Sequence, residues 1–333
     1  MSTGLSAAAT AEDVVLPATM QAWQWTGTGR PLTLNDVPVP RPGPGEVLLR
    51  VRAAGMCHSD VGELDEPSWA ENIHQNPITL GHEIAGDVVA LGESVTGIEL
   101  GQRFGVFPMG DTVPGYGRDG GYAAYHLVSA SDLVAVPDGL GYDLAALGTD
   151  AGMTSHHAVV EVAGAVPGQR IGIIGLGGLG QVGARIAVLH GAEVHAADTN
   201  PAAVELGRSL GLASVVSSAE ELIGLELDAV VDFAGFGSTT QAGLMAIRKG
   251  GTVVMVGMGA HTTPLVTADV VHQKARIVGS SGGTAADIAA VYTLLASGDL
   301  APVVTHLRFD QVPEGIERLR AGGVTGRLVV LND

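Results

Sequence analysis

Three short stretches in the first half of the chain contain side chains that bind metals or move protons. The candidates are Cys57, Ser59, Asp60, His82, Glu83 and Asp150. Thiolate, imidazole and carboxylate groups are ligands that zinc prefers, and a catalytic zinc takes three of them and keeps a fourth position open. Each residue alone also has a structural interpretation: Cys57 as a small core residue, His82 as a hydrogen-bonded core residue, and Asp150 as a helix N-cap.

A glycine-rich turn in the middle of the chain is the second chemical signal. The apolar run 171–174 predicts a buried strand, and the apolar spacing after residue 179 predicts a helix. Gly175, Gly177 and Gly180 lie between them with the spacing of a dinucleotide-binding turn. The first glycine permits the tight turn, the second lets the backbone approach a pyrophosphate, and the third lets the helix pack close to the strand. The helix N-terminus then offers N–H groups to phosphates, with Gly178 and Leu179 in the same turn.

An acidic residue follows the next predicted strand, 193–197. Asp198 lies about 20 positions after Gly175, where a carboxylate that binds the adenosine ribose is expected. A 2′-phosphate would meet this negative charge, and the segment 199–203 has no Lys or Arg to offset it. The sequence therefore favours NAD over NADP, against the alternative of a glycine-rich turn beside a surface aspartate.

The composition limits the class of protein. With 333 residues, 46% of them hydrophobic, the chain is long enough for two domains around a large core. The net charge of −18 disfavours nucleic acid and anionic membranes as partners, because both need a basic surface. No signal peptide or membrane-spanning run is predicted. The single cysteine excludes an internal disulfide, and we expect a cytoplasmic protein.

The elements that must hold these residues fall into two patterns. Short strands broken by Gly and Pro predict a partly closed, barrel-like β domain, and they lie at 21–25, 46–51, 84–91, 103–107, 123–128 and 133–136. Beyond residue 144 helices and strands alternate, and four further strands at 213–216, 228–233, 252–256 and 276–279 complete a doubly wound parallel sheet of six. A helix at 285–296 and a strand at 326–331 follow. We expect domains at 1–150 and 151–281, a segment 282–333 that returns to the first domain, and a loose tail at 1–18.

Together the motifs resemble those of the zinc-type medium-chain dehydrogenase/reductases, the alcohol dehydrogenase superfamily, from about Met20 onward. The matching text is Gly55-x-Cys57-His58-Ser59-Asp60, then Gly81-His82-Glu83-x-x-Gly86-x-Val88-x-x-x-Gly92-x-x-Val95, then the glycine turn. The segment 149–154 is most similar to bacterial secondary-alcohol dehydrogenases, in which an aspartate replaces a cysteine as the third zinc ligand. The resemblance implies a GroES-like catalytic domain followed by a Rossmann domain.

The resemblance also assigns roles. It implies Cys57, His82 and Asp150 as ligands of one catalytic zinc. Ser59 would hydrogen-bond the alcohol, Asp60 would orient the zinc-binding histidine, and Glu83 would sit behind the zinc. The implied cofactor-binding residues are Thr154 beside the nicotinamide, Arg327 on the pyrophosphate, Val256 at a strand end, and Gly175, Gly177, Gly178, Leu179, Gly180 and Asp198.

Two departures from the family pattern matter. The segment 107–122 contains no cysteine, so the lobe that often carries a structural zinc is missing and no structural zinc is expected. Many members also have a histidine shortly after the Ser-Asp pair that ends a proton relay. Here Val61-Gly62-Glu63 follows, and His74 is a candidate replacement by position only. Assembly as a dimer or tetramer is implied by the resemblance alone.

The predicted function is hydride transfer between NAD(H) and a secondary alcohol or ketone, a small-molecule substrate. Two alternatives remain open at this point. One is a zinc-free quinone or enone reductase of the same fold, and the other is a non-catalytic NAD-binding protein.

Overall fold

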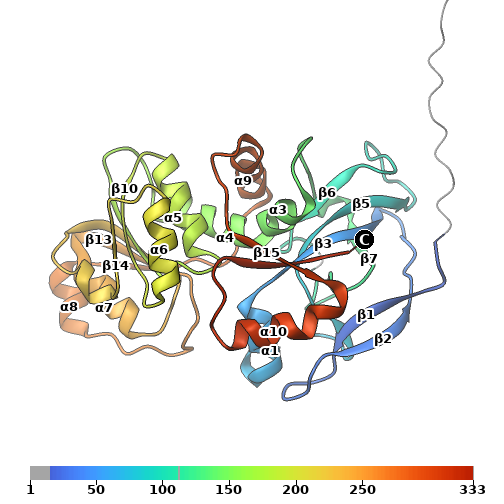
Figure 1. Cartoon of the computed structure of the whole chain (residues 1–333), viewed down its shortest axis with the longest axis horizontal. Coiled ribbons are helices and arrows are strands. Elements are labelled where there is room, and N and C mark those ends of the chain that lie inside the picture. Colours follow the sequence, from blue (N-terminus) through green and yellow to red (C-terminus); the bar gives the residue numbers. More distant parts are fainter. Residues whose placement is uncertain (1–15, 112, 333) are drawn as a thin grey trace, which may run out of the picture.

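The computed structural model describes residues 16–111 and 113–332, so most of the expected tail, 1–18, lies outside the described residues. Figure 1 shows two bodies side by side along the long axis, each built on its own sheet. The helices α4 (Met153–His156) and α9 (Ala285–Ser297) lie between them. In the part of the chain that the structure describes, no helix combines the length and the apolar character needed to cross a membrane.

The second body contains a six-stranded parallel sheet, and the predicted doubly wound fold is confirmed. The strand order is β11-β10-β9-β12-β13-β14, which is the order of a full dinucleotide-binding sheet. The strand order changes direction at β9 and β12, which are parallel neighbours although β10 and β11 come between them in the sequence. The glycine turn follows the carboxyl end of β9. The strands are β9 (Arg170–Ile174), β10 (Glu193–Ala197), β11 (Ser214–Val216), β12 (Leu227–Asp232), β13 (Ile247–Met255) and β14 (Arg276–Gly279). The helices are α5 (Gly180–Leu189), α6 (Pro201–Ser209), α7 (Ser238–Ala246) and α8 (Thr267–Gln273).

The first body is organised around β3 (Glu46–Met56), a long strand with two differently used edges. One edge pairs with β5 (Glu83–Leu91) along most of its length. The other edge is divided: β7 (Tyr125–Ser129) pairs with its first half, and β16 (Arg327–Leu331) pairs with its second half. The last strand of the chain is thus built into the first sheet, next to the end of β3.

The remaining elements complete the first body. The full sheet has seven strands in the order β15-β16-β3-β5-β6-β8 with β7 beside β3, and a separate three-stranded sheet has the order β2-β1-β4. The predicted barrel-like domain thus takes the form of these two sheets. Their other strands are β1 (Thr19–Trp25), β2 (Thr33–Pro38), β4 (Ile78–Thr79), β6 (Arg103–Val106), β8 (Leu133–Ala135) and β15 (Val304–Arg308). The helices are α1 (His58–Asp65), α2 (Pro67–Ala70) and α10 (Val312–Arg320), with short 3-10 turns at Ala130–Asp132, Ala219–Leu222 and Phe309–Gln311.

A helical run connects the two bodies. It begins with α3 (Tyr142–Leu147), passes through a π-helical turn at Gly148–Gly152, continues as α4 and ends in a second π-helical segment at His157–Val162. Single π-helical turns within helices are frequent at functional sites, because they redirect side chains. Asp150 lies inside the first π turn and is therefore not a helix N-cap. One apolar core packs this run against the nucleotide sheet and reaches Ala53 and Ala85 of the first sheet.

Candidate active site

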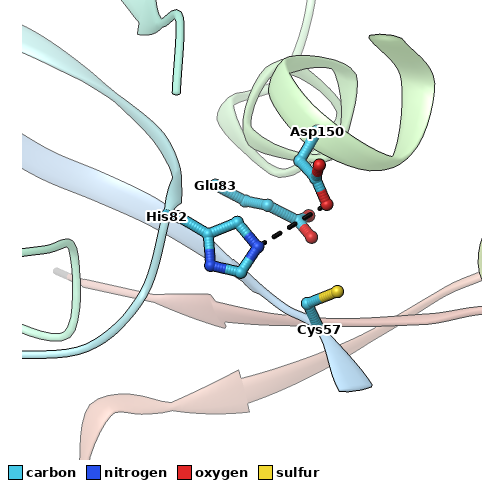
Figure 2. Close-up of side chains that lie close together, drawn as sticks. All are labelled: Cys57, His82, Glu83 and Asp150. Carbon is cyan, nitrogen blue, oxygen red and sulfur yellow. Dashed lines mark ion pairs between the residues drawn. The ribbon is translucent and has the colours of Figure 1, made fainter. Parts of the chain in front are cut away.

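Four side chains meet at one end of the first sheet. β3 and β5 are antiparallel, and Gly55 lies opposite Glu83. Cys57, just after the end of β3, is therefore close to His82, just before the start of β5. Asp150 comes from the π turn of the connecting helix. Ligand atoms of Cys57, His82, Glu83 and Asp150 all lie within 4.8 Å of one another. Figure 2 shows the four side chains directed toward a common region, with His82 and Asp150 joined as an ion pair.

Asp60 orients this cluster from α1. Its Oδ2 accepts hydrogen bonds from the Cys57 backbone N–H at 2.9 Å and from the Tyr122 hydroxyl at 2.6 Å. Its Oδ1 is buried without a hydrogen-bond partner among the described residues and lies 3.7 Å from His82 Nδ1. The other ring nitrogen, Nε2, lies 3.6 Å from Asp150 Oδ2. A carboxylate on one nitrogen of a histidine commonly fixes the ring so that the other nitrogen can bind a metal.

Arg327 is a buried cation that links the cluster to the glycine turn. It is 3% exposed, and its guanidinium forms a short ion pair with Glu83 and a second one with Asp150 Oδ2 at 3.3 Å. A Cβ added to Gly178 would lie 3.0 Å from a guanidinium nitrogen. The arginine thus pairs with two carboxylates and lies beside the turn where the sequence predicted a pyrophosphate.

The charges of the cluster suit a metal ion. Burial works to raise the pKa of the Cys57 thiol, but the Arg327 charge and a hydrogen bond from His82 outweigh it, so the pKa lies below its usual value. Burial works to lower the pKa of His82, but Asp150, Cys57 and Asp60 outweigh it and hold that pKa well above its usual value. Both shifts favour the charged forms of Cys57 and His82, and zinc binding releases protons from such ligands. The sulfur, nitrogen and oxygen donors and their spacing fit zinc.

Ser59 lies beside a second polar group. Its Oγ is buried and has no hydrogen-bond partner among the described residues. The Tyr116 hydroxyl interacts with both Ser59 and the buried Glu63 carboxyl, and its ring lies 6.0 Å from that of His82. His74 is exposed, and its backbone N–H donates to the Tyr116 carbonyl at 3.0 Å.

The glycine turn has the backbone that its sequence predicts. Gly175 has a φ of +86°, which favours glycine. A Cβ on Gly177 would have no heavy atom within 4 Å, so the backbone there is open to a ligand. A Cβ on Gly180 would lie 1.7 Å from the Gly175 carbonyl oxygen, so α5 needs glycine to pack this closely. Ser155 in the connecting helix donates a hydrogen bond to the Leu179 carbonyl at 2.9 Å.

Asp198 joins two turns at the same edge of the sheet. Its Oδ2 accepts from the Leu176 backbone N–H at 2.6 Å, and its Oδ1 accepts from the Asn200 N–H at 2.7 Å. The carboxylate therefore shapes the turn after β9 and keeps its negative charge beside it. Each oxygen retains a further lone pair for a ribose hydroxyl.

Two further predicted cofactor residues lie in the connecting helix and after β13. Thr154 is 7% exposed and donates to Asp150 Oδ1 at 3.1 Å, so it contacts the metal-site candidate directly. Val256 is half-buried at the end of β13.

Sequence reasoning assigned no role to Tyr116, Tyr122 or Glu63. The spacing of the motifs does not predict their role, because the interactions between Glu63 in α1 and the two tyrosines depend on how the segment after β6 packs against α1. The sequence offers one signal, because three of the five tyrosines fall between residues 116 and 125, two of them in the segment 107–122 that lacks cysteines.

Family comparisons agree with this architecture. Residues 43–138 match the alcohol dehydrogenase GroES-like domain, and residues 178–297 match the zinc-binding dehydrogenase domain. An alcohol dehydrogenase of Geobacillus stearothermophilus is 30% identical over 331 residues, which cover 91% of this chain and 97% of that protein. The chain belongs to the zinc-type medium-chain dehydrogenase/reductase family. An NAD-dependent alcohol dehydrogenase of Sulfurisphaera tokodaii is also 30% identical and covers 94% of this chain and 100% of that protein.

Solved structures give the same result. The acetophenone reductase of Geotrichum candidum, determined in complex with NAD, is 35% identical with a TM-score of 0.87 and covers 95% of this chain and 98% of its own. The alcohol dehydrogenase of Aeropyrum pernix is 26% identical with a TM-score of 0.87, and it covers 94% of this chain and 100% of its own. The predicted pair of domains, GroES-like and Rossmann, is confirmed, and the chain is an alcohol dehydrogenase by family and architecture.

Proposed function

We propose that this enzyme interconverts secondary alcohols and ketones, with one zinc held by Cys57, His82 and Asp150. The observation that carries the proposal is the convergence of these ligand atoms within 4.8 Å, beside a glycine turn to which Arg327 connects them. Zinc at this site would act as a Lewis acid that polarises the substrate oxygen and lowers the pKa of the alcohol.

The surrounding residues would keep one position of the metal open. Asp60 orients His82, and Arg327 holds the Glu83 carboxylate in an ion pair, so Glu83 is less free to become a fourth protein ligand. Three protein ligands and one open position are characteristic of catalytic zinc sites. Ser59 would orient the substrate oxygen and exchange a proton with it, because its buried Oγ forms no close hydrogen bond among the described residues.

The cofactor preference follows from Asp198. Its two backbone hydrogen bonds hold a negative charge at the sheet edge, and residues 199–203 contain no Lys or Arg. A 2′-phosphate would be repelled there, so we propose NAD rather than NADP. The preference for ketones and secondary alcohols is supported by the segment 149–154 and by the similarity to an acetophenone reductase.

Three organisational proposals accompany this function. The division into 1–150, 151–281 and 282–333 is supported by the return of β16 to β3. Assembly as a dimer or tetramer is compatible with β14, an edge strand of its sheet. A cytoplasmic location is favoured by the single cysteine.

Metal analysis tests the proposal. Mass spectrometry on protein purified without added metal should find about one zinc per chain, and chelation should abolish NAD-dependent oxidation of secondary alcohols. Asp150→Asn should lose most of the zinc, whereas Glu220→Gln, an exposed carboxylate far along the chain, should retain it. A metal-free protein that reduces quinones or enones would instead support the zinc-free reductase. NADH binding without turnover over a broad panel of alcohols and ketones would support a non-catalytic protein.

A further inference from the structure

Alcohol oxidation by NAD⁺ releases one proton per turnover, and the chain lacks the histidine that often follows the Ser-Asp pair. The structure shows that Gly62 in this segment has no room for a side chain. A Cβ there would lie 2.6 Å from the indole ring of Trp69, in α2. The proton from Ser59 must therefore leave by another group.

Two groups beside Ser59 have the required chemistry. The Tyr116 hydroxyl interacts with Ser59 and with the Glu63 carboxyl. Glu63 is 1% exposed, and both its Oε1 and Ser59 Oγ are buried without hydrogen-bond partners among the described residues. Each thus retains capacity to give or accept one more hydrogen bond, which a proton pathway needs.

Glu63 is placed to hold a proton. The groups that act most strongly on its charge are Asp60, Tyr116, His82 and Cys57. Burial and the negative charge of Asp60 raise the pKa of Glu63 to about 8. A general acid–base group is most effective when its pKa lies near the working pH.

We propose that Tyr116 and Glu63 form the proton pathway of this enzyme, a role that rests on the proposed alcohol oxidation. As the substrate hydroxyl gives its proton to Ser59 Oγ, the Ser59 proton passes to the Tyr116 oxygen and the Tyr116 proton passes to Glu63. One O–H bond breaks and one forms at each transfer, and the electron pair of the oxidised C–H bond leaves with NAD⁺. After product release Glu63 returns the proton through the hydroxyl of Tyr116, a residue that is half-buried. Ketone reduction uses the same pathway in reverse.

The test uses Glu63→Gln and Tyr116→Phe in the zinc-loaded enzyme, with the exposed Glu71→Gln as the matched control. Each of the two variants should lower kcat for alcohol oxidation about 100-fold with little change in KM. Zinc content and the NAD dissociation constant should stay within twofold of wild type, about the scatter of such measurements. The rise of the oxidation rate with pH should flatten in both variants and persist in Glu71→Gln.

Infrared difference spectroscopy gives a readout that is independent of turnover. Adding NAD⁺ and trifluoroethanol, an alcohol that resists oxidation, should produce the carbonyl band of a protonated buried carboxyl in wild type and in Glu71→Gln, and no such band in Glu63→Gln. If Tyr116→Phe keeps the wild-type kcat and pH profile, or if the band persists in Glu63→Gln, the pathway is wrong. If Glu63→Gln fails to hold zinc, the Tyr116→Phe result decides alone. Absence of turnover in wild type would instead refute the proposed function itself.

Discussion

Replacing Arg327 with methionine tests the charge balance of the metal site. Methionine keeps much of the side-chain length and removes the cation. The guanidinium is 3% exposed, and the Glu83 side chain that it pairs with is fully buried. Removing one partner of a buried ion pair leaves the other charge uncompensated, which costs about 3–5 kcal/mol of unfolding free energy. We expect that loss in the metal-free protein.

Zinc should reduce the loss. A divalent cation beside Glu83 and Asp150 replaces the missing positive charge, so the zinc-loaded variant should be destabilised by only about 1–2 kcal/mol. Wild type and Arg327→Met, each metal-free and zinc-loaded, form a thermodynamic cycle. The two losses of unfolding free energy differ by about 2 kcal/mol, so zinc must bind about 30-fold more tightly to Arg327→Met. The arginine, by this reasoning, weakens zinc affinity and preserves the open ligand position.

Urea unfolding measures the unfolding free energy of wild type and Arg327→Met in the metal-free and zinc-loaded forms. Chelator competition measures the zinc affinity of each protein. Arg320→Met is the control, because Arg320 pairs with Asp65 at the surface, where the side chains are 34% and 40% exposed. An exposed pair contributes at most about 1 kcal/mol, with no effect on zinc. A metal-free Arg327→Met protein that loses less than about 1 kcal/mol of unfolding free energy, or that binds zinc more weakly than wild type, would show that Arg327 does not compensate these carboxylates.

Three further predictions follow from single residues. Burial lowers the pKa of His126 from 6.5 to about 4, so the stability that depends on its neutral form is present above pH 6.5 and is lost as the pH falls through 4. The loss amounts to about 3 kcal/mol, and urea unfolding between pH 4 and 7 should show it in wild type and not in His126→Gln. Gly180→Ala should weaken NAD binding at least about tenfold, because its Cβ would lie 1.7 Å from the Gly175 oxygen. The control is Gly323→Ala, whose Cβ would meet no atom within 4 Å. Equal NAD affinity of the two variants would contradict the prediction. Asp198→Ala should weaken NAD binding about tenfold and shift the NAD/NADP affinity ratio toward NADP, so an unchanged ratio would remove Asp198 as the discriminating residue.

Much of the fold could be predicted from local sequence patterns. The six strands of the parallel sheet are short apolar runs, and all six form at or within one residue of their expected positions except β13, which begins at Ile247 instead of Thr252. The strand Val304–Arg308 and the helix Val312–Arg320 were missed. The former mixes polar with apolar residues and becomes a strand by pairing with β16, so its structure depends on tertiary contacts.

The site could be predicted in part. Cys57, His82 and Asp150 come close together in the structure, and their roles as zinc ligands stay a prediction. The π turn that carries Asp150 leaves no pattern in the sequence that differs from an ordinary helix. Glu63 and Tyr116 were missed because a buried carboxyl on a mostly polar helix has the same local sequence as an exposed one.

Because one edge of β3 pairs partly with the late strand β16, the catalytic centre can be completed only after β16 has been translated. The half of that edge nearest Cys57 pairs with β16, which also delivers Arg327 to Glu83. A nascent chain that has not yet passed residue 331 has the nucleotide-binding sheet complete, yet half of one edge of β3 is unpaired and the buried Glu83 carboxylate lacks its cation. An open strand edge in a partly folded chain is prone to aggregation. The enzyme therefore depends on its final strand to end this exposure, and truncation just before that strand is expected to leave insoluble protein that still carries nearly every residue of the active site.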